Sequence, residues 1–364
     1  MVATAQRFLE MNPSVEVRWE KRSLQEFADY PVEKLAETFD LLVIDHPFSG
    51  YAAAHRFLLP LEEHFSNDFL AEQASESVGR SHESYYYGGH QWALAIDAAT
   101  PVSCWRPDLA ERYGVSIPET WEELLTLAGL GRVVMPCIPV DCLMHFFMLC
   151  ASLGEDPCSQ TQRLISQDVG TRAVLMLKEL TSLCPPEIFG WNPISVYEVM
   201  TSRDDYVYCP FAYGYSNYAR PGYARTQLQF GDLVQIGSNG PGRSTLGGTG
   251  LAVSARCTHK QAALNYVGLV TSSECQRTLY AHSGGQPAHR SAWMDDALNH
   301  HCRDFFRGTM AAVERAYMRP RYDGYISFQD KAGILLHESL RKEDDARISI
   351  DELQRLYEQR AKQS

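Results

Sequence analysis

The sequence predicts an α/β protein that is divided into two domains. Its 364 residues are enough for two hydrophobic cores of about 150–200 residues each. Short apolar runs of strand type alternate with longer runs of helical periodicity, which is the rhythm of a doubly wound sheet. Two segments interrupt this rhythm, a polar one over residues 97–103 and a glycine-rich one over residues 237–255. At the first of these segments, an apolar strand that ends in polar residues indicates that the chain leaves one domain and enters the other.

The N-terminal part of the chain shows this alternation. Residues 3–11 have the apolar spacing of a helix, and Asn12–Pro13 ends it. Residues 15–19 alternate apolar and polar as a strand does, residues 24–38 follow as a helix, and residues 39–44 form an apolar run typical of a buried strand. The pattern therefore predicts a strand, a helix and a second strand in one sheet.

The region around the first crossing has clear start and stop signals. An apolar strand is expected over residues 92–96, ending at Asp97, and residues 102–105 are again extended. Thr120 and Glu123 then have the spacing of a capping box, in which each side chain accepts a hydrogen bond from a free backbone N–H of the first helical turn. Such a cap stabilises a helix by about 1 kcal/mol, so we expect a helix to begin at Thr120.

Similar signals organise the rest of the chain. A short strand over residues 132–135 is followed by Asp141, which we expect to cap a helix over residues 142–153. An apolar stripe predicts a helix over residues 168–183, and a second capping box at residues 349–352 predicts the start of the last helix.

Residues 206–218 contain five tyrosines among thirteen residues. One interpretation is a structural cluster of rings on the surface of a domain. The other is the wall of a ligand pocket, because a tyrosine ring has a flat apolar face and a polar tip. Both interpretations remain open at this point, and the second makes Tyr213 and Tyr215 candidate binding residues.

Composition excludes several classes of partner. The net charge of −12 argues against nucleic acid and anionic membranes, because both favour clusters of lysine and arginine. No run of 18 apolar residues is present, so no membrane-spanning helix is expected. The ten cysteines lack paired CxxC spacing, which favours free thiols packed as small apolar groups rather than a zinc framework.

The sequence has no motif that indicates catalysis. A G-x-S-x-G elbow, an HExxH motif and a dinucleotide fingerprint are all missing. Asp45 and His46 can be combined on paper with a distant Ser or Cys, but chance pairings of this kind are expected among 12 histidines and 10 cysteines. Adjacent His300 and His301 point to different faces of a helix, so they do not predict a metal site. We expect no catalytic residues, no metal and no cofactor.

Several motifs, taken in order, resemble those of the extracellular solute-binding proteins of family 1, which includes the maltose-binding protein. The first group lies around the first crossing, and further matches cover almost the whole chain: residues 8–17, 40–45, 87–94, 97, 105, 118–124, 247–254, 272–276 and 284–287. Residues 247–254, for example, are similar to the glycine-rich strand by which that family returns to its first lobe.

The resemblance implies a type II periplasmic-binding-protein fold, with a mixed sheet flanked by helices in each of two lobes and three hinge crossings. The implied boundaries are residues 1–98 with 253–304 for lobe one, residues 103–250 with 305–364 for lobe two, and crossings near 97–103, 250–254 and 304–310. The implied function is capture of a small polar solute, with a sugar or similar ring-bearing solute favoured, in the interlobe cleft by hinge closure. The implied protein is monomeric and delivers its ligand to an ABC permease.

We expect ligand contacts at residues that follow strands, lie at crossings or supply aromatic walls. Asp45 and His46 follow a predicted strand at the edge where α/β sheets bind ligands, although Asp45 also suits a helix cap. Asp97 either binds ligand or holds the crossing, and Arg321 either pairs with an anion or is solvated. The full set is Asp45, His46, Asp97, Thr100, Trp191, Tyr213, Tyr215, Thr249 and Arg321.

One departure from the family concerns the N-terminus. The family starts with a strand that lies before its first helix, whereas this sequence begins within that helix. A missing central strand leaves backbone groups unpaired, so we expect the natural start, with a signal or short leader, to lie upstream of Met1. The family implies a periplasmic or cell-surface location. The absence of a signal peptide and the ten cysteines favour the alternative, a cytoplasmic enzyme or ligand sensor on the same fold.

Overall fold

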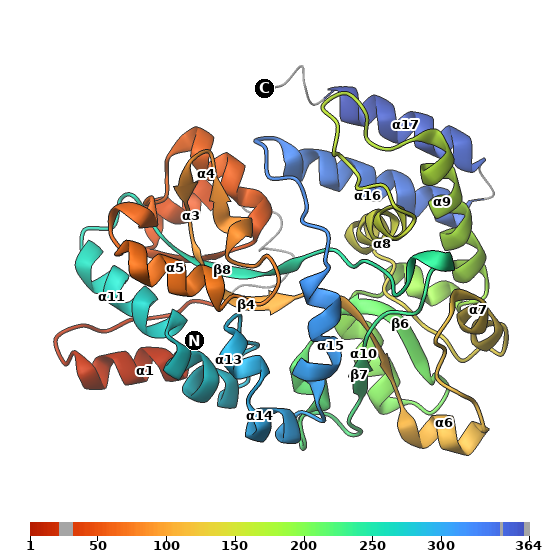
Figure 1. The fold of residues 1–364 in the computed structure, drawn as a ribbon, viewed down its shortest axis with the longest axis horizontal. Coiled ribbons are helices and arrows are strands. Elements are labelled where there is room, and N and C mark those ends of the chain that lie inside the picture. The colour runs from red at the N-terminus through yellow and green to blue at the C-terminus, as the bar shows by residue number, and fades with distance from the viewer. Residues whose placement is uncertain (22–31, 343–344, 360–364) are drawn as a thin grey trace. The chain divides into compact units, whose positions relative to one another are not determined.

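The computed structural model describes residues 1–21, 32–342 and 345–359. The chain folds into two compact units (Figure 1). Unit 1 contains Met1–Ala98, Gly247–Asn299 and Arg321–Asp323, and unit 2 contains Ala99–Leu246, His300–Pro320 and Gly324–Ser364. Both units combine helices with a small sheet, so the α/β class is confirmed.

The sheet of unit 1 has three strands in the order β1 (Leu41–Ile44), β8 (Gly247–Val253) and β4 (Leu94–Ala99). β1 runs antiparallel to β8, with Ile44 opposite Gly250. Helices pack around this sheet, and the core includes Phe8, Leu251 and Val267. A separate hairpin is formed by β2 (Tyr86–Tyr87) and β3 (His90–Gln91). The helices of this unit are α1 (Val2–Met11), α3 (Val32–Thr38), α4 (Ser49–His55), α5 (Asn67–Ser75), α11 (Lys260–Thr271), α12 (Ser273–Cys275), α13 (Arg290–Trp293) and α14 (Asp296–His301), whose last two residues belong to unit 2.

Two predictions in unit 1 are wrong and one is tested only in part. Residues 15–19 keep the alternation of a strand, with residues 15, 17 and 19 half-buried, but they have no ladder partner among the described residues. A strand is defined by its pairing, so periodicity alone did not suffice. β4 continues through Asp97 to Ala99, so Asp97 lies within a strand rather than after it. Of the helix predicted over residues 24–38, the part before residue 32 lies outside the described residues.

The sheet of unit 2 has the order β6 (Tyr208–Tyr213), β5 (Pro101–Trp105) and β7 (Gln229–Gly231), with both neighbours antiparallel to β5. The apolar helix α8 (Pro139–Ser152) is buried from Asp141 to Ser152, as expected of a helix that is apolar on all sides. It packs against α16 (Tyr325–Arg341) and α9 (Gln167–Ser182). The remaining helices are α6 (Pro107–Tyr113), α7 (Trp121–Gly129), α10 (Pro193–Ser202), α15 (Phe305–Glu314) and α17 (Ala346–Gln359).

Cap predictions in unit 2 had mixed outcomes. Thr120 caps α7 as predicted, because its Oγ1 accepts from the Glu123 N–H at 3.3 Å. α8 begins before Asp141, at Pro139, since proline is suited to the first helical position; Asp141 therefore lies inside the helix. Ser349 lies inside α17 and shares a hydrogen bond with the hydroxyl of Ser339 at 2.6 Å. The strand predicted over residues 132–135 is reduced to one bridge, Val133 with Tyr208.

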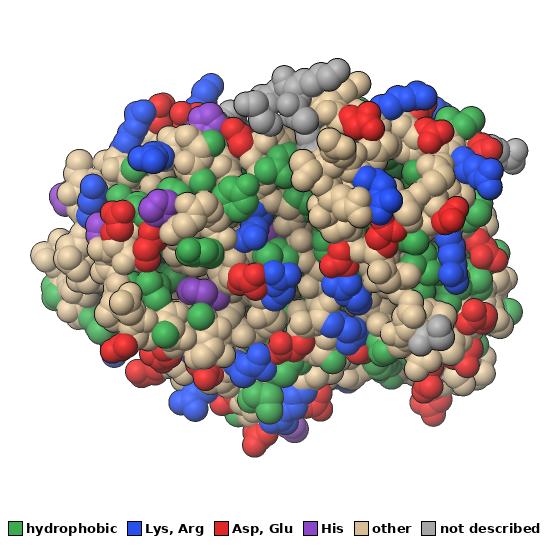
Figure 2. Space-filling view, turned by 45° about the horizontal axis from the view of Figure 1, so that its top comes forward, with side chains coloured by type: hydrophobic (Ala, Val, Ile, Leu, Met, Phe, Trp, Pro, Cys, Tyr) green, Lys and Arg blue, Asp and Glu red, His purple; other side chains and the backbone are tan. Residues whose placement is uncertain are grey.

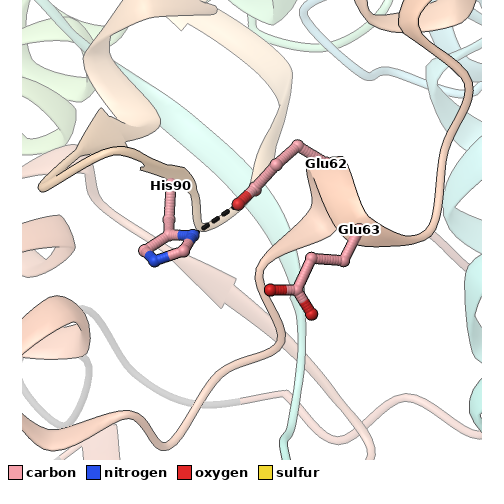
Figure 3. Close-up of side chains that lie close together, drawn as sticks. All are labelled: Glu62, Glu63 and His90. Atoms are coloured by element: carbon pink, nitrogen blue, oxygen red, sulfur yellow. Dashed lines mark hydrogen bonds and ion pairs between the residues drawn. The ribbon is translucent and has the colours of Figure 1, made fainter.

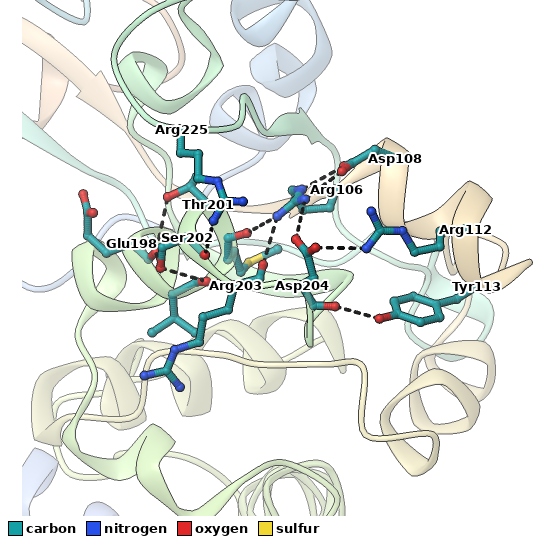
Figure 4. A network of polar contacts seen from close by, with 12 residues as sticks. Arg106, Asp108, Arg112, Tyr113, Glu198, Thr201, Ser202, Arg203, Asp204 and Arg225 are labelled. Atoms are coloured by element: carbon teal, nitrogen blue, oxygen red, sulfur yellow. Dashed lines mark hydrogen bonds and ion pairs between the residues drawn. The ribbon is translucent and has the colours of Figure 1, made fainter.

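A buried arginine ties the end of β5 to the segment that follows α10 (Figure 4). Arg106 is 2% exposed, and its guanidinium donates to both carboxylate oxygens of Asp108 at 2.7 Å. It also donates to the carbonyls of Met200 and Arg203 and to Asp204. Charge-assisted bonds of this kind fix backbone geometry. Arg106 therefore fixes the position of residues 200–204 relative to the end of β5.

All ten cysteines are free, and all but the half-buried Cys158 are buried. The prediction of small apolar packing groups is thus confirmed.

Figure 2 shows acidic and basic side chains interspersed on the displayed face, without a large area of one sign. No helix within the described ranges has the length and apolarity needed to cross a lipid bilayer.

Candidate functional site

In unit 1, four of the predicted site residues lie at one end of the sheet. Asp45 and His46 directly follow Ile44, which pairs with Gly250 of β8. Thr249 precedes Gly250. Gly248 lies so close to β4 that a Cβ on it would come within 2.2 Å of the Asp97 carbonyl oxygen. The register therefore brings Asp45, His46, Asp97 and Thr249 to the same edge.

Asp45 has the structural role that the sequence left as an alternative. Its Oδ1 accepts from the His46 N–H at 2.8 Å and caps the short 3-10 helix His46–Phe48. The same oxygen lies 3.2 Å from Nδ1 of His46, whose side chain is fully buried, whereas Asp45 is 23% exposed. Asp45 is therefore partly accessible, whereas His46 lies beneath the surface.

Asp97 is a carboxyl of this edge whose pKa is shifted by burial. It lies in the middle of β4, and its backbone forms an isolated antiparallel β-bridge with Pro287. Burial raises the pKa of its carboxyl to about 7, because a desolvated carboxylate is disfavoured. Near neutral pH the group is thus present in both protonation states, and it can accept or donate a hydrogen bond.

Tyr85 is a residue of this edge that sequence reasoning missed. It is 1% exposed, and its hydroxyl donates to the carbonyls of Ile44 and Gly248 at 3.3 and 3.4 Å. A Cβ at Gly250 would come within 2.8 Å of its ring. Tyr85 was one of three successive tyrosines in the sequence, and no local signal separated the buried one from its neighbours.

Arg321 also belongs to unit 1, and backbone carbonyls surround its guanidinium. Nη1 lies 2.9, 3.2 and 2.8 Å from the carbonyl oxygens of Glu83, Ser84 and Tyr86. Burial lowers the pKa of Arg321. These contacts favour a role in holding residues 83–86 over the role of pairing with an anionic ligand.

In unit 2, Thr100, Tyr213 and Tyr215 lie together where β5 and β6 meet. Pro101 is opposite Tyr213, and Thr100 Oγ1 donates to the Thr245 carbonyl at 2.9 Å. The Tyr213 hydroxyl lies 3.3 Å from Thr245 Oγ1. Tyr213 and Tyr215 are half-buried, whereas Thr100 is buried, so the two rings are the accessible part of this group.

A second residue that the sequence analysis missed supports these tyrosines. Tyr197 of α10 is fully buried, and its hydroxyl donates to the carbonyls of Ala212 and Tyr213 at 3.2 and 2.9 Å. Its ring meets that of Tyr215 edge-on, with centroids 6.2 Å apart. Trp191 is placed differently, because its ring packs against Tyr206, before the start of β6, at 6.4 Å. The structure thus groups three of the four residues predicted for unit 2.

One cluster of potential metal ligands occurs among the described residues, and it was not predicted. Glu62, Glu63 and His90 each place a ligand atom within 4.8 Å of the others (Figure 3). Glu62 already bonds His90 and accepts from the Gln91 N–H at 2.9 Å. Although burial opposes it, these hydrogen bonds lower the pKa of Glu62. Glu62 and His90 are thus already bonded to each other, and Glu63 is exposed.

These arrangements provide hydrogen bonding and ring stacking. The group in unit 1 offers carboxylates and a threonine hydroxyl, which can form hydrogen bonds with hydroxyl groups. The group in unit 2 offers half-buried phenol rings, which can pack on the apolar face of another ring. The fold that carries them is the two-lobe type II fold of ABC solute-binding proteins, as comparison with solved structures shows.

The maltose-bound MalE3 of T. maritima matches with a TM-score of 0.84 and 19% identity, over 97% of this chain and 94% of that chain. A solute-binding protein of Agrobacterium radiobacter K84, in complex with ribitol, matches at 0.82 and 18%, over 98% and 94%. One from Agrobacterium vitis S4, with bound D-mannitol, matches at 0.78 and 15%, over 99% and 94%. No protein-family model and no curated protein matches the sequence.

Proposed function

We propose that this protein is a solute-binding protein that captures a sugar or a polyol for ABC-type uptake. The observation that carries the proposal is the full-length match to chains whose structures contain maltose, ribitol or D-mannitol. Those ligands are uncharged and rich in hydroxyl groups, which agrees with the side chains described above. A permease of the ABC type would be the partner, and the protein would bind its ligand without transforming it.

The proposed contacts are the half-buried residues of the predicted set that lie at the sheet edge of unit 1 or where β5 and β6 meet in unit 2. In unit 1 these are Asp45, Asp97 and Thr249, whose oxygen atoms can bond to ligand hydroxyls. In unit 2 they are Tyr213 and Tyr215, whose rings can stack on a sugar ring. His46, Thr100 and Arg321 would act by holding the backbone, because the His46 N–H, the Thr100 hydroxyl and the Arg321 guanidinium already bond within the protein.

The experiment is a thermal-shift screen of the purified protein. The panel contains oligosaccharides, monosaccharides, pentitols and hexitols, with organic acids and polyamines as charged controls. A ligand present at 100-fold over its Kd adds about 2.7 kcal/mol and should raise Tm by several degrees. We expect shifts from one group of carbohydrates or polyols only.

Chromatography of the recovered ligand separates binding from turnover. An unchanged ligand supports the binding function, whereas a product that accumulates with time would establish an enzyme instead. If a protein that unfolds cooperatively shows no shift with any sugar or polyol, the proposal is wrong.

A further inference from the structure

Unit 1 carries a cluster of metal-binding side chains that the proposed solute site does not use. Glu62, Glu63 and His90 each place one ligand atom within 4.8 Å of the other two, and Figure 3 shows how they approach one another. The two carboxylates come from the 3-10 helix Leu61–Glu63, whereas the imidazole comes from β3. The cluster therefore combines nitrogen and oxygen donors from two separate segments, unlike a row of acidic residues on one helix.

The segment that carries the two glutamates is anchored in the protein interior. Leu61 is fully buried and belongs to the hydrophobic core cluster of unit 1. The Glu63 N–H donates to the Pro60 carbonyl at 3.2 Å, and the His64 N–H donates to the Leu61 carbonyl at 3.0 Å. Both glutamates thus project from a short turn whose backbone is held against the core.

The hairpin that carries the histidine is held in place as well. His90 is opposite Tyr87 in the β2–β3 pair, and β3 packs on the 3-10 helix. The imidazole meets the ring of Trp92 edge-on, with centroids 5.3 Å apart. Trp92 is buried, and its indole N–H donates to the Tyr87 carbonyl at 2.9 Å. The ring of His90 is therefore oriented before an ion binds, which lowers the entropic cost of binding.

Hydrogen bonds also prepare the carboxylate of Glu62 for a cation. Its Oε2 accepts from the Gln91 N–H at 2.9 Å, and its Oε1 bonds to Nδ1 of His90. Burial opposes ionisation of Glu62, but the hydrogen bonds to His90 and Gln91 outweigh it and lower the pKa of this carboxyl. Partners of this kind orient a carboxylate that ligates a metal. A metal ion would take the place of the proton between Nδ1 and Oε1.

The cluster is accessible to an ion from solution. The side chains of Glu62 and His90 are 28% and 39% exposed, and Glu63 is exposed. Zinc bonds to nitrogen and oxygen at about 2.0–2.2 Å in tetrahedral sites, so its ligand atoms lie about 3.4 Å apart. Ligand atoms that are now within 4.8 Å need to close by at most about 1.4 Å per pair. Rotation of the exposed Glu63 side chain can supply much of this movement.

The donor set selects the class of metal. One imidazole and two carboxylates are ligand types that zinc accepts, and three protein ligands leave the fourth position to water. Calcium requires six to eight oxygen ligands, and magnesium requires an octahedron of oxygen atoms, so neither ion makes use of the imidazole. Nitrogen in the set therefore favours zinc over these hard cations.

We propose that Glu62, Glu63 and His90 bind one zinc ion. The ion links the β2–β3 hairpin to the 3-10 helix and stabilises unit 1, because it binds the folded chain and not the unfolded one. Protons compete for the same imidazole and carboxylates, so zinc binding weakens at acid pH. The site is independent of the proposed solute binding, since it uses none of the residues assigned to that function.

The test is a titration of the full chain, first freed of metal by a chelator, with zinc chloride alone. Calorimetry should give a stoichiometry of one zinc per chain, and saturating zinc should raise Tm by several degrees. His90→Ala and Glu63→Gln should each weaken zinc binding at least about tenfold. His301→Ala is the matched control, because His301 is an exposed histidine of α14 outside the cluster. It should bind zinc as the natural protein does.

Two further measurements keep the proposal falsifiable if His90→Ala does not fold. In the natural protein, the lowest zinc concentrations should shift the NMR signals of the His90 imidazole before those of the other histidines. Calcium at the same concentration should leave Tm unchanged. Absence of zinc binding, or zinc affinity that is equal in the natural protein and Glu63→Gln, would overturn the proposal. Calcium binding as tight as that of zinc would also overturn it, because it would indicate an acidic surface only.

Discussion

Gly248 of β8 lies against the backbone of Asp97 in β4, so closely that a Cβ at position 248 would stand 2.2 Å from the Asp97 carbonyl oxygen and 3.0 Å from its carbonyl carbon. Gly248 also has φ +96°, a conformation that residues with a Cβ rarely adopt. Two independent constraints thus require glycine at the point where the candidate residues of unit 1 converge.

Gly248→Ala should destabilise the protein by roughly 3 kcal/mol or more, because the close approach adds to the backbone strain. Gly89→Ala is a matched control, since Gly89 has φ +89° but a Cβ added there would meet no atom within 4 Å. It should cost about 1–2 kcal/mol from the backbone alone. Urea unfolding of both variants measures the difference, and equal losses would show that the contact with Asp97 is unimportant.

The raised pKa of Asp97 predicts a pH dependence of stability. The folded-state pKa is about 7, against an ordinary value of 3.8, so the folded protein binds a proton that the unfolded chain releases between these values. Stability contributed by this group is therefore complete below about pH 4 and is lost as pH rises toward 7. Over that interval the loss amounts to a few kcal/mol.

Asp97→Asn provides the measurement, because an amide stays neutral at every pH. Relative to the natural protein, the variant should become more stable as pH rises from about 4 to about 7, the interval between the two pKa values, so its free energy of unfolding should increase by comparison. An unchanged difference across this range would mean that Asp97 ionises as readily in the folded protein as in the unfolded chain.

The buried Arg106 should contribute more to the free energy of unfolding than the exposed Arg112, which bonds to the same carboxylate, that of Asp204. Arg106→Ala leaves the carbonyls of Met200 and Arg203 without their donor, at a cost of roughly 3 kcal/mol or more. Arg112 pairs with Asp204 at the surface, so Arg112→Ala should leave the denaturation midpoint nearly unchanged. Chemical denaturation compares them, and similar midpoints would contradict this role of Arg106.

The sequence predicted many elements but not always their partners. The alternation in residues 15–19 was identified correctly, but a strand also needs a neighbour, and periodicity does not show whether one is present. Ser349 and Glu352 have the spacing of a capping box, but this spacing also occurs within a helix. Ser349 lies inside α17, and its hydroxyl bonds to that of Ser339 instead of capping the helix. Tyr85 and Tyr197 were missed because their roles depend on the carbonyls of strands outside their own segments. Local capping at Thr120, in contrast, was predictable because every participant lies within five residues.

Under the proposed function, the tyrosines of unit 2 should determine ligand affinity. Tyr213→Ala should weaken binding of the carbohydrate or polyol found in the screen at least about tenfold, since loss of a stacked ring costs about 1.4 kcal/mol or more. Tyr223→Ala is the control, because Tyr223 is 55% exposed and packs on Tyr218 rather than on Tyr213. Calorimetric titration gives Kd for each protein, and near-ultraviolet circular dichroism verifies that the fold is kept. If Tyr213→Ala binds as tightly as the natural protein while Tyr223→Ala does not, the rings that contact the ligand have been assigned to the wrong part of unit 2.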